Sequence, residues 1–365
     1  MSKRAPRKNR FIERIKRIGL TSDRDFFLHN LSVLMSSGMT LRQALSAIKD
    51  GVKNKRMKNI ISILQEDVEE GDKLSEGLAR TGLFSSYVLS LVRIGEESGR
   101  LSDNLEVVAL NEQKTREFKS KIKSAMMYPV FVFGVTLVVG IGIAWFILPR
   151  LTVVFSQLNV ELPAVTRALI RVGEFIAEYG NIVMPLAIAL IILIFYTLFF
   201  FPKTRFIGEW ILYHIPGIKE LLKEVELARF GYLFGTLLRA GLPVGQALES
   251  VTDSTTSLRH RKLYKNLQDE VLEGNSFYKS IIKRKKNKKL IPSTVAQMIN
   301  AGEQSGKLPE TFLRIGEYYE GRTEIQTKNL TTILEPVLLV IVWLGVVGVA
   351  VAVILPIYGL LSGLQ

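Results

Sequence analysis

Three long runs of apolar residues interrupt the chain, and none of them contains a charged side chain. They cover residues 129–149, 182–201 and 336–356. A helix of about 20 residues is about 30 Å long, which matches the hydrocarbon core of a bilayer. Buried core helices of a soluble protein are the alternative. Three separate uncharged runs of this length favour transmembrane helices at 128–149, 182–201 and 336–356.

The polar segments between these runs carry the charge. The formal net charge is +14, which nucleic acid, an anionic membrane surface or an acidic partner would each explain. Lys and Arg crowd residues 3–24 and 114–123, and the second group directly precedes the first apolar run. Basic residues beside a span mark its cytoplasmic end, so the pattern indicates membrane lipids and argues against a nucleic-acid partner.

The N-terminus is predicted to lie in the cytoplasm, because its basic residues are not followed by the apolar stretch of a signal peptide. Alternation across three spans then places the C-terminus outside the cytoplasmic (inner) membrane of a multi-pass protein. The predicted parts outside the spans are a basic tail at 1–21, a cytoplasmic module at 22–127, an extracytoplasmic loop at 150–181, a second cytoplasmic module at 202–335 and an extracytoplasmic tail at 357–365.

The two cytoplasmic modules repeat each other in sequence. Residues 27–45 align with 230–248 at an offset of 203, and residues 94–101 align with 301–308 at an offset of 207. The larger offset places a short insertion near the basic run Lys283–Lys289, which is therefore predicted to be a loop. The repeating unit is a module together with the span that follows it, while the middle span stands alone.

Each module is predicted to be a short antiparallel bundle of helices. Gly38 and Gly241 follow apolar residues at helical spacing, where a glycine with positive φ ends a helix. Thr40 and Pro243 suit the start of the next helix. In the first module, further helices are expected at 57–70, at 84–94 and from 102 to 124, with a tight reversal at Gly95–Gly99. The fold class is an all-α membrane protein with two duplicated cytoplasmic helical-bundle modules and three transmembrane helices.

Two motifs support a family resemblance. FxxxLxxLxxSGxxLxxAL at 27–45 and GExSGxL at 95–101 each have a counterpart in the second module, and a span follows each copy. This arrangement resembles the type II secretion system F protein family over about residues 22–360. The loop sequence LPAVTR at 162–167 is similar to the LPxxTR element of that family. The chain departs from the pattern at Val244-Gly245 and in its short N-terminal tail, which leaves the subfamily open.

The resemblance implies a platform protein in the inner membrane, beneath a growing type IV pilus or type II secretion pseudopilus. It also implies that the protein is a scaffold and not an enzyme. The implied partners are a hexameric secretion or pilus ATPase, membrane adaptor proteins, and pilins or pseudopilins. A homo-oligomer is also expected, from the sequence of the spans. Small residues spaced four apart in the spans, such as Gly140 and Ala144, permit close helix contacts between copies.

The motif residues are candidates for structural turns or for partner contacts. Glycines permit positive φ, serine hydrogen-bonds the turn, and Glu96 or Glu303 caps exposed N–H groups. The alternative places both glutamates on a surface that touches the ATPase or an adaptor. The candidates are Gly38, Gly95, Glu96, Ser98, Gly99, Gly241, Gly302, Glu303, Ser305 and Gly306.

Other patterns point to no catalytic, cofactor or metal site. Residues 301–307 (AGEQSGK) resemble a phosphate-binding loop, but leucine follows the lysine where such a loop needs Ser or Thr. The acidic residues of 66–72 make a calcium site conceivable, although a solvated helix end or a surface for a basic partner fits better. His29, His214 and His260 are isolated and are interpreted as structural, and there is no cysteine.

The leading functional hypothesis is therefore a platform for pilus or pseudopilus assembly. A small membrane transporter or channel subunit is the alternative, but the spans lack the ionisable residues that transport pathways commonly contain. A membrane enzyme is a third option, opposed by the absence of a catalytic constellation in the sequence.

Overall fold

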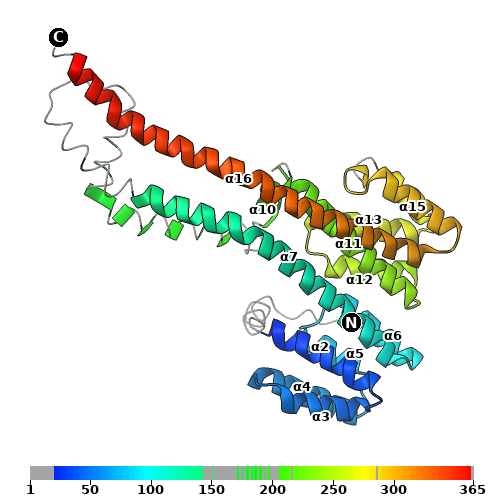
Figure 1. Ribbon diagram of the computed structural model, residues 1–365. Helices are drawn as coiled ribbons and strands as arrows, with labels where there is room; N and C mark the ends of the chain where they lie inside the picture. Colours follow the sequence, from blue (N-terminus) through cyan, green and yellow to red (C-terminus); the bar gives the residue numbers. More distant parts are fainter. Residues whose placement is uncertain are drawn as a thin grey trace. The chain divides into compact units, whose positions relative to one another are not determined.

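The structure is a computed structural model that describes residues 20–142, 205–214, 217–284 and 287–362, with isolated positions between 150 and 197. All regular elements in these residues are helices (Figure 1). The all-α fold class is thus confirmed for the described part of the chain. Most of the predicted basic tail, of the predicted extracytoplasmic loop and of the second predicted span lies outside the described residues.

The chain divides into two compact units. The first unit comprises residues up to Lys119 together with Lys223–Thr323, and the second comprises Ser120–Leu222 together with the residues from Glu324 onward. Segments far apart in the sequence therefore fold together. The first unit brings together most of the two predicted cytoplasmic modules, and the second contains the apolar segments.

The first half of the first unit contains short helices and the beginning of one long helix, which continues into the second unit. Thr40 forms a capping box with Gln43 at the start of α3, and Asn54 and Ser85 cap α4 and α6 through their side chains. The helices are α2 (Thr21–Ser36), α3 (Leu41–Gly51), α4 (Lys55–Glu69), α5 (Leu74–Thr81), α6 (Ser86–Ser98) and α7 (Leu101–Gly142).

The second half has helices in a corresponding order. Ser257 and Ser276 cap α13 and α14 through their side chains, and Pro243 precedes α12. The helices are α11 (Ile218–Arg239), α12 (Val244–Ser254), α13 (Leu258–Leu272), α14 (Phe277–Ile282), α15 (Ser293–Gln304) and α16 (Leu308–Ser362), with a 3-10 turn, η2 (Asn287–Lys289), before α15. A further helix, α10 (Arg205–Leu212), belongs to the second unit.

Glycines with positive φ end the helices at matching places in the two halves. Gly38 has φ of 85° and Gly241 has φ of 94°, as the sequence predicts. The amide after each glycine donates to a carbonyl five residues back: Met39 N to Leu34 O and Leu242 N to Leu237 O. This pattern is the Schellman motif, which satisfies carbonyls at the end of a helix. Gly71 and Gly274 end α4 and α13 in the same way.

Three details differ from the sequence-based expectation. The short helices α5 and α14 were not expected, and they fill the stretches after Gly71 and Gly274. Helix α6 continues to Ser98, so most of the predicted reversal at Gly95–Gly99 is helical. The predicted loop at Lys283–Lys289 contains the turn η2, whose buried Asn287 donates to the carbonyls of Ser280 and Ile281. A buried asparagine that bonds two free carbonyls at a helix end explains that turn.

Aromatic side chains fill the core of the second half. Phe312 meets Phe234 and Phe277 edge to face, at ring-centroid distances of 4.7 Å and 5.4 Å. Phe230 stacks on Tyr264 at 4.3 Å. Such pairs contribute about 0.5–1.5 kcal/mol each beyond burial of apolar area. In the first half, aliphatic residues such as Leu31, Leu45, Ile61, Leu78 and Leu91 are fully buried.

Helices α11 and α16 cross at very close range. A Cβ at Gly231 would lie 2.4 Å from the backbone nitrogen of Gly316 and 2.6 Å from the carbonyl oxygen of Phe312. Side chains flank the crossing: Tyr232 Oη donates to Glu320 at 2.6 Å, and Arg322 lies 2.9 Å from the buried Glu224. Only glycine permits this backbone contact, so the sequence at Gly231 and Gly316 sets the distance between the two helices.

The parts of α7 and α16 that belong to the second unit expose large hydrophobic side chains. The stretch Leu308–Gly348 of α16 is long and apolar enough to cross a membrane, with a mean hydropathy of 2.3 in its most apolar window and only 6% of that window buried. A shorter apolar stretch covers Val130–Gly140 in α7. Exposed apolar surface of this extent on a protein marks contact with a partner or with lipid.

Substitution of Gly231 by alanine tests the close crossing. We expect G231A to lower the free energy of unfolding by about 1–3 kcal/mol, because the new methyl group meets backbone atoms that cannot rotate away. Thermal unfolding of the full chain in detergent measures this. The matched control is G321A on α16, where a Cβ meets no atom within 4 Å. G321A should be neutral or stabilising by up to about 1 kcal/mol, because alanine favours the helix. Equal effects of the two variants would contradict the crossing.

Candidate functional site

Glu96 caps the N-terminus of α5. It lies in the last turn of α6, and its carboxylate accepts hydrogen bonds from the backbone N–H groups of Leu74 and Ser75, the second at 3.1 Å. These amides belong to the first residues of α5, whose preceding residue Lys73 provides no side-chain cap. A carboxylate at this place satisfies two free donors and complements the positive end of the helix dipole.

Glu303 plays the same part in the second half. Its carboxylate oxygens accept from the backbone N–H groups of Phe277 at 2.5 Å and Tyr278 at 3.0 Å, at the start of α14. Each glutamate thus joins the helix that carries the GExSG motif to the short helix before it. Both are half-buried, so the geometry favours a structural role for the two carboxylates.

The serine and the second glycine of each motif form the helix end. Ser98 Oγ donates to the carbonyl of Ile94 at 2.7 Å, and Ser305 Oγ donates to the carbonyl of Ala301 at 2.8 Å. Gly99 and Gly306 both have φ of 69°, which L side chains rarely adopt. These two glycines reverse the chain into α7 and α16.

The first glycine of each motif serves a different purpose from the one expected. Gly95 and Gly302 are helical and do not have positive φ. A Cβ at Gly95 would lie 2.9 Å from Cα of Leu101, and one at Gly302 would lie 2.8 Å from Cβ of Thr311. Close approach of the following helix, and not backbone conformation, therefore requires glycine at both places.

A shallow groove of about 520 Å³ adjoins the second motif. The helices α15 and α16 line it with Met298, Ala301, Gly302, Ser305, Lys307, Glu310, Thr311 and Arg314. The segment that resembles a phosphate-binding loop forms one wall. Its amides already donate within the helix end: Ser305 N to Ala301 O at 3.0 Å and Lys307 N to Gly302 O at 2.8 Å. Amides used in this way cannot cradle a phosphate.

The acidic cluster at 66–72 is balanced from within the chain. Arg80 lies 2.7 Å from Asp67 and 3.1 Å from Asp72, and Arg42 lies 2.9 Å from Glu69. The hydrogen bond to Asp67 is the main cause that raises the pKa of the Arg80 guanidinium. Among the described residues, no group of three or more His, Cys, Asp or Glu is arranged to hold a metal ion. The geometry therefore favours ion pairs over a calcium site.

The three histidines do not converge. His29 is on α2, His214 follows α10 and His260 is on α13. His260 is fully buried, with Nδ1 at 3.1 Å from Ser257 Oγ, and its burial lowers the pKa of the imidazole to about 4. A neutral buried histidine beside a helix cap fits the structural role expected of it.

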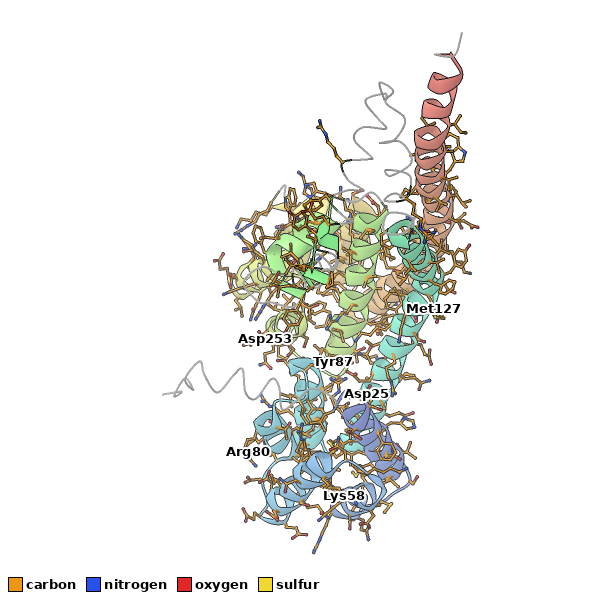
Figure 2. The ribbon with its side chains drawn as sticks, turned by 90° about the vertical axis from the view of Figure 1, so that its left-hand side faces the viewer. Asp25, Lys58, Arg80, Tyr87, Met127 and Asp253 are labelled. Atoms are coloured by element: carbon orange, nitrogen blue, oxygen red, sulfur yellow. The ribbon has the colours of Figure 1, made fainter. Side chains whose placement is uncertain are left out.

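The contact between α6 and α12 could not be predicted from the sequence. The backbone N–H of Tyr87 donates to Ser254 Oγ at 3.2 Å, and the hydroxyls of Ser90 and Ser250 lie 2.7 Å apart. Tyr87 and Asp253, labelled in Figure 2, stand on the two sides of this contact. Serine is common on solvated helix faces, so the only available signal was that small hydroxyl residues recur on α12 at helical spacing.

These features define a class: a helical protein with two halves of matching helix order, joined to long, exposed apolar helices. Sequence similarity identifies its family. The sequence profile described as "Type II secretion system (T2SS), protein F" matches residues 27–149 and 231–356. The chain belongs to this type II secretion system protein F family.

Relatives match most of the chain. It is similar to the type IV pilus assembly protein PilC of Pseudomonas aeruginosa, with 28% identity over 92% of this chain and 88% of that protein. PilC of Thermus thermophilus is 28% identical over 94% of this chain and 84% of that protein. The type II secretion system protein F of Vibrio cholerae is 26% identical over 92% of this chain and 82% of that protein.

Replacement of Glu96 tests the capping role. We expect E96A to lower the free energy of unfolding by about 0.5–2 kcal/mol, because two backbone donors at the start of α5 lose their acceptor. The neighbouring E97A is the matched control, since Glu97 makes only an exposed ion pair with Lys73. That pair is worth less than about 1 kcal/mol. Denaturant titration of the full chain in detergent compares them, and an equal loss in both variants would rule out the cap.

Proposed function

We propose that this protein is the inner-membrane platform on which a type IV pilus or a type II secretion pseudopilus assembles. The observation that carries the proposal is the family match in both halves of the chain. It is supported by relatives that are named for pilus assembly or secretion and that align with this chain over most of their length. In this proposal the protein is a scaffold. It positions other proteins and does not itself catalyse a reaction.

The proposed architecture has two copies of one cytoplasmic module and three transmembrane helices at 128–149, 182–201 and 336–356. The packing of α6 on α12 supports it, because two halves that share one compact unit must lie on the same side of a membrane. The chain must then cross the membrane an even number of times between them, which two spans achieve. The third span leaves the C-terminus outside and the basic N-terminus in the cytoplasm.

The long helices provide a route for motion. Helix α7 has 42 residues and α16 has 55, and both continue from the first unit into the second. At 1.5 Å per residue they are about 60 Å and about 80 Å long. In the proposed mechanism, a hexameric ATPase and adaptor proteins move the cytoplasmic modules. The continuous helices transmit that movement to the bilayer, where pilins or pseudopilins leave the lipid and join the fibre.

The topology predicts which positions react with a membrane-impermeant maleimide. The natural chain has no cysteine, so single cysteines give a clean signal. We expect Q365C to react in intact cells with a permeable outer membrane. N59C on α4 and K262C on α13 should react only after lysis, because both lie in cytoplasmic modules. Reaction of K262C in intact cells, with N59C protected, would place the two modules on opposite sides and contradict the topology.

Purification from native membranes tests the proposed function. A chain tagged at its N-terminus and extracted in mild detergent should recover a hexameric secretion ATPase and pilin-like proteins, identified by mass spectrometry. A tagged unrelated membrane protein of similar abundance is the control. Reproducible absence of these partners, with solute-dependent flux in proteoliposomes instead, would overturn the platform and favour a transporter.

A further inference from the structure

The two halves of the first unit pack through elements that do not correspond. At the offset of 207, α6 in the first half corresponds to α15 in the second, and at the offset of 203, α12 corresponds to α3. The observed contact joins α6 to α12. No comparable packing joins α15 to α3 in the part of the chain that the structure describes. The contact is therefore head to tail, and a face remains open on each half.

The open face of the second half lies on α15. Tyr87 and Leu91 of α6 are buried, but their counterparts Thr294 and Met298 are exposed, and 38% of Met298 is accessible. Gln297, the counterpart of Ser90, is also exposed. The groove of about 520 Å³ described above begins at Met298 and Ala301. An apolar side chain and a groove thus lie on the surface of α15 that corresponds to the packing surface of α6.

The open face of the first half lies on α2 and α3. On the covered face of the second half, Thr236 and Ser250 are buried. Their counterparts in the first half are Val33, which is 48% exposed, and the exposed Ala47. Phe26 beside them is 42% exposed, and its ring lies 3.7 Å from the position that a Cβ of Gly51 would take. The result is an exposed apolar surface with small residues at its centre.

We propose that these two faces bind each other in different copies of the chain: α15 of one copy packs on α2 and α3 of the next. This inference rests on the proposed function, for which it names the surface between platform subunits. The contact between α6 and α12 within one chain indicates what covers the open faces. Helix α15 corresponds to α6 and helix α3 corresponds to α12, so these surfaces of two copies can pack in the same way. A second copy of the chain carries a complementary face for each of the two open faces. A different partner protein would cover one open face and leave the other exposed.

The chemistry of this contact differs from that within the chain. Ser250 and Ser254 correspond to Ala47 and Gly51, so the two serine hydrogen bonds are not repeated. Apolar area replaces them: Met298 meets small residues flanked by Phe26 and Val33. Burial of such apolar side chains away from water stabilises the contact. A head-to-tail contact of this kind makes a ring if the rotation closes and a longer assembly if it does not.

Disulfide crosslinking between differently tagged chains tests the proposal. Ser90 lies against Ser250, so the corresponding pair between copies is Gln297 against Ala47. Coexpressed A47C and Q297C chains, oxidised in native membranes, should form mixed dimers at least several-fold more than either chain forms with itself. A chain that carries both substitutions should give a ladder of higher oligomers.

The control pairs Q297C with N59C, an exposed position on α4, which is not one of the helices that form the proposed face. Equal crosslinking of the control, A47C–A47C dimers, or a bond within the double-substituted chain would each overturn the proposal. The assay needs neither the ATPase nor a fibre. Loss of crosslinks while the tagged chain still recovers its assembly partners would refute this surface alone, whereas crosslinks without partners would refute the platform alone.

Discussion

The packing of α6 on α12 holds the two halves of the chain together. It joins residues more than 150 positions apart, through Ser90 with Ser250 and Tyr87 with Ser254, and brings both halves into one compact unit. Neither half can then move to the opposite side of a membrane. In the proposed topology, the chain must therefore leave the cytoplasmic side after the first half and return to it before the second half begins.

Within each half, the GExSG motif links three helices at one corner. Its glutamate caps the preceding short helix, its second glycine reverses the chain, and its first glycine lets the next long helix approach. The corner therefore fixes how α7 and α16 leave their bundles. The proposed mechanism needs a rigid exit at this corner, because a flexible corner would absorb the displacement before it reached the membrane.

Much of the fold could be predicted from the sequence. Gly38 and Gly241 were recognised as helix ends because glycine after an apolar helical pattern has few other uses. The helices α5 and α14 were missed because six to eight residues show too little periodicity. The positive φ predicted for Gly95 and Gly302 is wrong. A sequence shows that a glycine is present, but not whether backbone conformation or close packing requires it. The α6–α12 contact was out of reach because serines carry no signal of burial.

An intrachain disulfide is the most direct test of this contact. The hydroxyls of Ser90 and Ser250 lie 2.7 Å apart, so cysteines at these positions should have their sulfur atoms within bonding range. In native membranes, oxidation of S90C/S250C should link the two halves of a single chain. Peptide mass spectrometry on mixed, differently tagged chains would show the bond within one tag only. Thiols that stay free, or bonds that join only different chains, would contradict the shared unit and the topology derived from it.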